Sequence, residues 1–429
     1  MTTGQHRAVR RQRAGLKAMA GRLSWGLGDQ AVSSLTNFAI GIFVARELGI
    51  TAFGMFSLAW VTYGVLINIS RGLATDPLMV RFSGVDTGIW RGAVAGASAT
   101  ALVIGVLAGA VSVIFGIAAG GDFGSAFVAL GVILPSLLLQ DSWRFAFFAS
   151  GEGQKAFLND VVWGVAMIPT MVLASLHANV VTFLLAWGGG ATVAAAYGYV
   201  QTRLRPSLAG VRAWLRDHRD LGARYLVENV SNSSGSQIRM YGLGAIAGVA
   251  AVGTVRGGEL LLGPFVAVLM GLAFVAVPEA ARVVKRNVHK LTRFCFVLGG
   301  TQAFAALLWG TTLFLVLNDR LGEFVLGDVW HTARLLILPA TFSVFNASFI
   351  GGAATGLRAL GAARRSMRCQ LIASVLYVAG GLIGATVGGA VGSGWGVAMA
   401  TFTSAFVWWT QLHFAVRAHI RTPQETRTS

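Results

Sequence analysis

The chain has 429 residues, of which 55% are hydrophobic and only 12% are charged, and its formal net charge is +17. Soluble domains carry about 25% charged residues, so this composition excludes a disordered chain and argues against a water-soluble fold. The two cysteines, Cys295 and Cys369, exclude a disulfide framework and a zinc site.

Residues 1–26 are polar and basic, and we expect them to form a cytoplasmic N-terminal segment. No small-residue cleavage site follows, so the first apolar run is read as a retained helix. Apolar runs of roughly 20 residues then recur along the chain, and in lipid each must be helical to satisfy its backbone hydrogen bonds. Twelve spans are predicted: Leu27–Val44, Phe53–Ile69, Ala93–Ile117, Ser125–Phe148, Ala156–Leu176, Val180–Val200, Tyr225–Val249, Leu260–Val277, Phe294–Leu317, Ala333–Ala354, Leu371–Val387 and Gly394–Val416.

The placement of Lys and Arg predicts the orientation of these spans. Most of the 34 Lys and Arg residues lie in alternate connections, which are cytoplasmic if both termini are cytoplasmic. This positive-inside bias predicts a multi-pass protein of the plasma (inner) membrane. It also explains the net charge, so we expect contact with membrane lipids and no nucleic-acid partner.

The longest polar stretch between spans, residues 203–224, divides the chain into an N-lobe (27–202), a C-lobe (225–417) and a cytoplasmic tail (418–429). Its apolar residues at helical spacing, Leu204, Leu208, Val211 and Leu215, favour an amphipathic cytoplasmic helix at the membrane surface. A solvated linker with chance periodicity is equally consistent with the stretch.

The two halves resemble each other. Leu48–Gly54 aligns with Ala247–Gly253, and Ile133–Pro135 aligns with Ile337–Pro339. Because each half has an even number of helices, the repeats must be parallel. The sequence therefore predicts an all-α polytopic membrane protein with about twelve transmembrane helices, arranged as two parallel six-helix lobes around a central cavity. Such lobes support transport by alternating access, although the matches are short and chance similarity is the alternative.

Charged residues inside a span generally face a cavity or a partner, because they are costly in lipid. The seventh span is the most polar, and Glu228, Asn232 and Arg239 share one of its faces, with Gln237 nearby. The guanidinium of Arg239 suits an anionic head group. The alternative is a structural pair with a buried acid from another helix.

Other candidates lie in the first half of the chain. In the first span, Asp29 and Asn37 share a face; Asp29 and Glu228 are candidates for coupling to a proton or sodium ion, or else interfacial helix caps. Arg71 and Arg144 are candidate cavity residues. Snorkelling to the interface is the alternative for both, and an i, i+3 pair with Asp141 is a further alternative for Arg144.

No sequence pattern indicates catalysis. There is no Walker motif, and the seven histidines lack metal-ligand spacing. We therefore expect no enzymatic activity, no catalytic residues, no metal and no cofactor. The pair Arg256 and Glu259, near the outer face, is predicted to be structural.

Several short motifs point to a family. They are Asp29–Phe38, Val44–Gly49, Phe53–Phe56 and Arg71–Leu78. With these motifs the chain resembles bacterial polysaccharide exporters, in the lipid-linked oligosaccharide flippase branch of the multidrug/oligosaccharidyl-lipid/polysaccharide (MATE-like) superfamily.

The resemblance implies two six-helix bundles and export of a polyprenyl-diphosphate-linked glycan, with Arg71, Arg144 and Arg239 available to meet the diphosphate. The peptidoglycan-precursor branch usually has two extra helices, so a capsule or exopolysaccharide precursor is favoured. We expect a monomer.

Two other functions are consistent with parts of the sequence. A cation-coupled multidrug antiporter of the same superfamily would need a cavity with net negative charge. A membrane glycosyltransferase or polymerase would need larger outer loops than the short connections predicted here.

Overall fold

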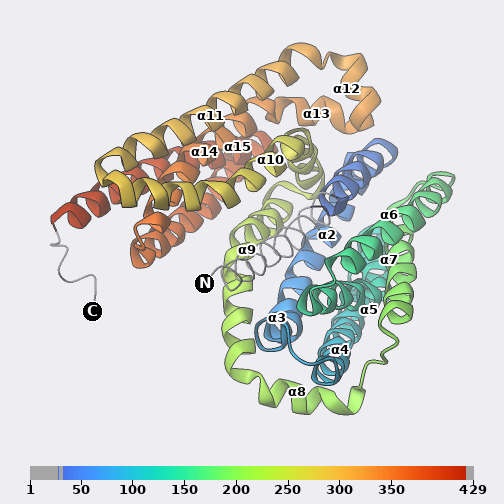
Figure 1. Cartoon of the computed structure of the whole chain (residues 1–429). Coiled ribbons are helices and arrows are strands. Elements are labelled where there is room, and N and C mark those ends of the chain that lie inside the picture. Colours follow the sequence, from blue (N-terminus) through green and yellow to red (C-terminus); the bar gives the residue numbers. More distant parts are fainter. Residues whose placement is uncertain (1–27, 29–31, 422–429) are drawn as a thin grey trace, which may run out of the picture. The chain divides into compact units, whose positions relative to one another are not determined.

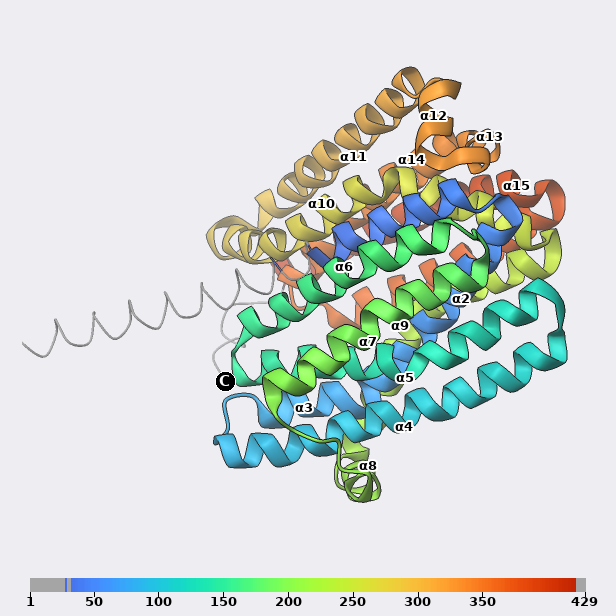
Figure 2. The same ribbon diagram turned by 90° about the vertical axis from the view of Figure 1, so that its right-hand side faces the viewer.

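The computed structural model describes residue 28 and residues 32–421. The first helix covers residues 32–47. In chain order it is followed by α2 (Ile50–Ser70), the π-helical turn η1 (Arg71–Thr75), α3 (Asp76–Phe82), α4 (Thr87–Ala119), α5 (Gly121–Ser150), α6 (Gly153–Ser175), α7 (Val180–Thr202), η2 (Leu208–Gly210), α8 (Val211–Asp217), α9 (Arg219–Ala247), α10 (Val249–Asn287), η3 (Val288–Lys290), α11 (Leu291–Val316), α12 (Asp319–Leu326), η4 (Gly327–Val329), α13 (Trp330–Ala333), η5 (Arg334–Leu336), α14 (Ile337–Ala359) and α15 (Ala363–Arg421) (Figures 1 and 2).

The predicted all-helical membrane fold is confirmed over the described residues, which contain no strand. Nine of the described helices are long and apolar enough to cross a membrane. The twelve predicted spans exceed this number because the first helix is short as described, α9 is polar, and α15 contains two spans. Within α15, Gly388 and Gly389 leave the helical conformation, and Gly389 has a φ of +57°, so the chain turns there.

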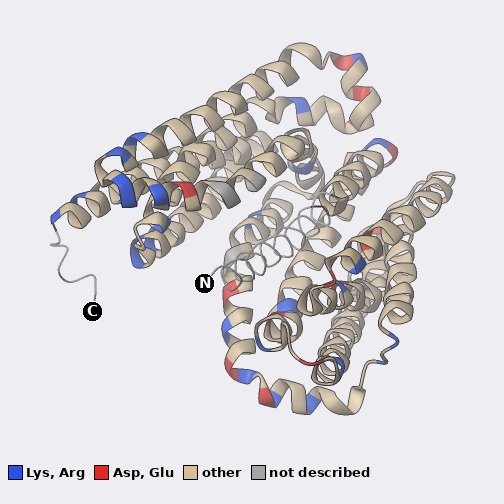
Figure 3. Ribbon diagram, viewed as in Figure 1, with Lys and Arg blue, Asp and Glu red and all other residues tan. Residues whose placement is uncertain are grey.

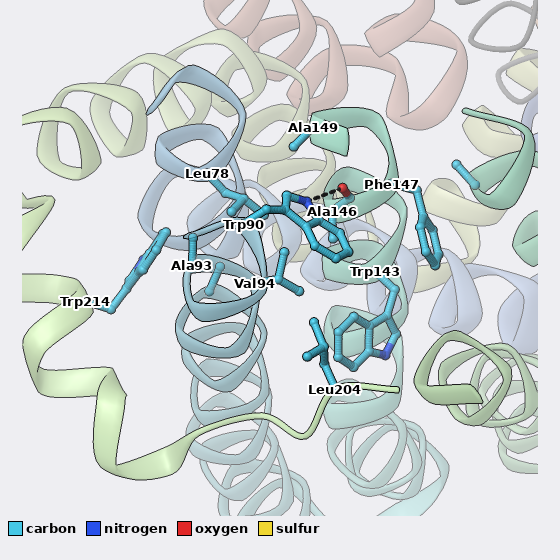
Figure 4. Packing of buried hydrophobic residues seen from close by; sticks show 12 residues of the cluster. Leu78, Trp90, Ala93, Val94, Trp143, Ala146, Phe147, Ala149, Leu204 and Trp214 are labelled. Carbon is cyan, nitrogen blue, oxygen red and sulfur yellow. Dashed lines mark hydrogen bonds between the residues drawn. The ribbon is translucent and has the colours of Figure 1, made fainter. Parts of the chain in front are cut away.

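The first of two compact units comprises the described residues up to Ala39 together with Ala59–Ser234. Its helices α4, α5, α6 and α7 pack in neighbouring pairs (Figure 2). At one end of this bundle, Trp90, Trp143 and Trp214 belong to one buried cluster (Figure 4).

The linker between α7 and α9 is part of this cluster. Of the predicted apolar stripe, Leu204 is buried in this cluster, whereas Leu208 and Leu215 are exposed. The buried anchor of α8 is Trp214, which is 5% exposed and packs against Gly96 of α4. The linker helix is therefore attached to the helix bundle through an indole that the periodicity analysis did not consider.

The second unit comprises Ile40–Leu58 and the described residues from Gly235 onward. It contains the end of the first helix, the start of α2 and all of α10 to α15. Cys295 and Cys369 lie in its buried cluster as free thiols. Lys and Arg gather at one end of its helices, around η3 (Figure 3).

The two segments that align in the sequence repeat contact each other inside the second unit. A Cβ atom on Gly54 would overlap the carbonyl oxygen of Val249, and a Cβ on Gly253 would overlap the carbonyl oxygen of Ile50. The repeat alignment places Gly54 on Gly253 and Ile50 on Val249. The contact is therefore reciprocal, as a two-fold relation between the repeated segments would produce.

This reciprocal contact predicts that Gly54→Val destabilises the protein by about 1–3 kcal/mol, because the added side chain forces two backbones apart. Gly253→Val should have a similar effect. Gly49→Ala is the matched control, since a Cβ at that position meets nothing within 4 Å. Thermal unfolding of the purified protein in detergent measures the difference, and equal midpoints for Gly54→Val and Gly49→Ala would contradict the contact.

Candidate functional site

The first unit contains a partly buried ion pair between Arg71 and Asp141. Arg71 is the first residue of η1, and Asp141 lies on α5. The guanidinium donates two hydrogen bonds to the carboxylate, from Nε to Oδ2 at 3.0 Å and from Nη2 to Oδ1 at 2.7 Å. The ring of Phe145 lies 5.1 Å from the Arg71 guanidinium carbon. This two-point pairing fixes the direction of the Arg71 side chain.

Arg144 extends the pair into a cluster of four charges. It lies one turn after Asp141 on α5, and its Nη1 is 3.6 Å from Asp141 Oδ1. Its Nε is 3.1 Å from Oδ1 of Asp160, which lies on α6. Two arginines and two aspartates therefore balance each other in what we call the first-unit cluster: Arg71, Asp141, Arg144 and Asp160.

The members of the first-unit cluster differ in exposure. The side chains of Asp141 and Asp160 are each 2% exposed and that of Arg144 is 10% exposed, whereas that of Arg71 is 30% exposed. The carboxylates are thus enclosed by protein, and Arg71 presents the accessible charge. An approaching anion would meet a guanidinium first.

Buried amides support the acidic side of this cluster. Gln140 donates to Asp160 at 2.9 Å and to the side-chain oxygen of Asn159 at 3.2 Å. Asn159 in turn donates to the carbonyl of Ala194 and to Gln201 on α7. These hydrogen bonds connect α5, α6 and α7 and hold Asp160 in place.

The first-unit cluster has no counterpart in the second repeat. The alignment of Pro135 with Pro339 places Asp141 on Phe345 and Arg144 on Ser348. At these two positions the second half carries uncharged side chains, so the pair of Asp141 and Arg144 is not repeated there.

The second unit contains a smaller charged group, which we call the second-unit cluster: Arg239, Arg256 and Glu259. Arg239 Nη2 is 2.6 Å from Glu259 Oε1, and Arg256 Nη1 is 3.2 Å from Glu259 Oε2. Two guanidinium groups share one carboxylate, so one positive charge is in excess. Side-chain exposure is 4% for Arg239, 33% for Arg256 and 36% for Glu259.

The structure encloses Arg239 on its other sides. Its guanidinium carbon lies 5.1 Å from the centre of the Tyr377 ring on α15. A Cβ on Gly381 would lie 2.7 Å from the Arg239 Cδ, so the glycine makes room for the alkyl chain. Arg239 is therefore a buried, paired residue, as the structural alternative in the sequence analysis described. An anion could reach it only if Glu259 moved away.

The remaining predicted site residues are spread over both units. Asn37 lies half-buried on the first helix, Glu228 is exposed on α9, and Gln237 is half-buried further along α9. The side chain of Asn232 is outside the described part, and Asp29 lies outside the described residues. The structure thus brings Arg71 and Arg144 together in the first unit, whereas Arg239 belongs to the second unit.

Sequence reasoning missed one member of these clusters, Asp160, and one residue that lies against them, Tyr377. Asp160 lies within the predicted span Ala156–Leu176, and an acid in an apolar run was a signal that could have identified it. Tyr377 gave no such signal, because an aromatic residue in a span is ordinary. The predicted pair of Arg256 with Glu259 is present, but it also includes Arg239.

Comparisons with known proteins identify the fold. No protein-family model matches the chain, and no curated protein matches it significantly. Solved structures do match. One is described as the inward-facing conformation of a multidrug resistance MATE family transporter of the MOP superfamily, with 16% identity, a TM-score of 0.70, and coverage of 91% of this chain and 96% of that chain.

Two further structures match with 16% identity, each covering 95% of this chain and 97% of that chain. One is the outward-facing conformation of a multidrug resistance MATE family transporter, with a TM-score of 0.54. The other is a MOP superfamily transporter from Pyrococcus furiosus, with a TM-score of 0.53. With its long apolar helices, the chain is a multi-pass membrane protein that has the fold of the MATE family transporters of the MOP superfamily.

Proposed function

We propose that the protein is a transporter that moves a lipid-linked oligosaccharide or polysaccharide precursor across the plasma membrane by alternating access. The observation that carries this proposal is the exposure of Arg71. It is the accessible member of a cluster whose two carboxylates are each only 2% exposed. A guanidinium fork of this kind matches the geometry of a diphosphate head group.

The polarity of the second-unit cluster supports the same choice of cargo. It carries one positive charge in excess, and Arg256 is its accessible base. A cationic drug would be repelled by such a group, whereas an anionic head group would be attracted. The long apolar tail of a lipid-linked precursor could stay in the bilayer while the head group binds these charges.

Pocket polarity has been connected with function in this fold. The Pyrococcus furiosus transporter is described as having a binding pocket of reverse polarity that suggests a different function. That description concerns the archaeal protein. It supports the use of charge sign as the criterion for choosing among cargoes here.

A cation-coupled multidrug antiporter is the second candidate. The observation in its favour is the carboxylate of Glu259, which is 36% exposed and could bind a cation or a coupling ion. Asp29 and Glu228 remain candidates for coupling to a proton or sodium ion. We prefer the flippase because two arginines share one acid in the second-unit cluster. In addition, the accessible charge of the first-unit cluster is an arginine, Arg71.

The proposal predicts that Arg71→Gln lowers export of the glycan precursor by roughly 10- to 100-fold, the loss expected for one charge-assisted pair of hydrogen bonds. The matched control is Arg81→Gln, because Arg81 forms an exposed ion pair with Asp220 and belongs to neither cluster. The measurement is the amount of lipid-linked glycan on the inner leaflet of cells that depend on each variant. Accumulation is expected with Arg71→Gln and not with Arg81→Gln.

Depletion of the protein distinguishes the two candidate functions. Inner-leaflet accumulation of lipid-linked glycan on depletion would support the flippase. Unchanged glycan with altered resistance to cationic dyes would overturn it in favour of the antiporter.

We propose that the protein lies in the plasma membrane as a monomer, with both termini cytoplasmic. Accessibility of tags at the two termini tests the orientation.

A further inference from the structure

The helix that carries Arg71 contains an extra residue. The π-helical turn Arg71–Thr75 joins α2 to α3, and the amide of Asp76 donates to the carbonyl of Arg71 across five residues. A π-helical turn inserts one residue into an α-helix and rotates the two flanking segments relative to each other by about 100°. The direction of Arg71 therefore depends on this turn.

Contacts on both sides of η1 show its effect. Before it, Asn68 Nδ2 lies 3.2 Å from Ser233 Oγ; after it, Asn229 Nδ2 lies 2.7 Å from Asp76 Oδ2. In a continuous α-helix, positions 68 and 76 would point about 80° apart. With the extra residue they differ by about 20°, so both side chains reach α9.

Pro77 cannot donate to the backbone carbonyl of η1 that would be its partner in an α-helix. In an α-helix the carbonyl of Leu73 would accept from the amide of residue 77, and proline has no amide hydrogen. Trp214 supplies the missing hydrogen bond from outside, because its indole Nε1 donates to the Leu73 carbonyl at 3.1 Å. An unpaired carbonyl at this depth would be unfavourable.

The donor is held rigidly. The Trp214 ring lies against His218, with ring centres 4.0 Å apart and the ring planes tilted by 31°, and it packs against Gly96 of α4. Figure 4 shows Trp214 approaching α4 from the linker, opposite Trp143. On another side of η1, a Cβ on Gly72 would lie 2.6 Å from backbone atoms of Leu226, so α9 also presses against the turn.

From these contacts we propose that Trp214 is a positioning residue for Arg71. Its indole N–H stabilises the π-helical turn, and the turn orients Arg71 toward Asp141. Without that hydrogen bond the Leu73 carbonyl would lose this donor, the geometry of the turn would change, and Asp76 would move away from Asn229. The cytoplasmic linker thereby sets the geometry of a residue that, on the proposed function, contacts the cargo.

The test is chemical cross-linking across the turn in Trp214→Phe, which keeps an aromatic ring and removes the N–H. In a chain whose Cys295 and Cys369 are replaced by Ala, the pair Asp76→Cys and Asn229→Cys reports on the segment after η1. The pair Asn68→Cys and Ser233→Cys reports on the segment before it. A short bifunctional thiol reagent applied to native membranes measures the cross-linked fraction.

We expect Trp214→Phe to lower cross-linking of the 76–229 pair by roughly 2- to 10-fold, the equilibrium shift that one hydrogen bond produces. The 68–233 pair should be unchanged. Trp90→Phe is the matched control, because Trp90 is also buried in this cluster but donates to the carbonyl of Ala146 on α5 (Figure 4). It should change neither pair.

Each outcome decides the inference. Unchanged cross-linking of the 76–229 pair in Trp214→Phe would overturn it, as would an equal loss at both pairs or the same loss in Trp90→Phe. Cross-linking does not depend on the cargo, so a failure of the proposed function is separable. If Arg71→Gln exports normally while Trp214→Phe shifts the 76–229 pair, the flippase proposal fails and the role of Trp214 in η1 stands.

Discussion

Replacing Asp141 with Asn should destabilise the protein by about 1–3 kcal/mol, because the change removes the buried carboxylate that pairs with the partly exposed Arg71. Asp141 is 2% exposed and accepts two hydrogen bonds from Arg71, and it also lies 3.6 Å from Arg144. Arg144 keeps Asp160 as a partner, so most of the loss comes from Arg71. Thermal unfolding in detergent measures the effect.

The double variant Arg71→Gln with Asp141→Asn separates stability from transport. It removes both charges of one pair and leaves two amides that can hydrogen-bond, so most of the lost stability should return. Export should remain low, because the accessible guanidinium is gone. Recovery of export together with stability would show that Arg71 has a structural role only.

Replacing Glu259 with Gln should have a larger effect in the second unit, about 3–5 kcal/mol, because the arginine left unpaired is buried. Arg239 is 4% exposed, and Glu259 is its ion-pair partner at 2.6 Å. The neutral amide would leave the Arg239 charge uncompensated between Tyr377 and Gly381. Loss of folded protein on size-exclusion chromatography and a lowered unfolding midpoint would both report the change.

Arg256→Gln is the matched control for this prediction. Arg256 binds the same carboxylate, but its side chain is 33% exposed, and exposed pairs contribute about 0–1 kcal/mol. We therefore expect Arg256→Gln to fold normally and to lower export if Arg256 meets the cargo. Equal destabilisation by Glu259→Gln and Arg256→Gln would refute the distinction between the buried and the accessible arginine.

Each of the two arginine clusters contains one buried and one partly exposed arginine, and each of these arginines has a carboxylate partner. Arg144 and Arg239 are 10% and 4% exposed, and each has a carboxylate within hydrogen-bonding distance. Arg71 and Arg256 are about one-third exposed. If an anionic head group replaced Asp141 as the partner of Arg71, the charges of Arg71 and Arg144 would both stay neutralised, because Asp141 would remain beside Arg144.

The sequence by itself determined the class of fold and the positions of the helices. Runs of apolar residues such as Ala93–Ile117 have to be helical in lipid, because no water is present to hydrogen-bond their backbone. The polar stretch at 203–224 was recognisable as a linker for the same reason. Arg71, Arg144 and Arg239 were identifiable because a charge inside an apolar run needs a partner or a cavity.

Only the tertiary structure decided which partner each charge has. Arg71 and Asp141 are 70 residues apart in the chain, and the sequence analysis paired Asp141 only with its helical neighbour Arg144, which does lie 3.6 Å from it. Arg239 could have faced a cavity or an acid, and the packing of α9 against α10 gives it Glu259. Likewise, Pro77 shows that a carbonyl loses its donor, but only the folded linker shows that Trp214 replaces it. Local pattern determines where a charge or an unpaired carbonyl occurs, whereas long-range packing determines what neutralises it.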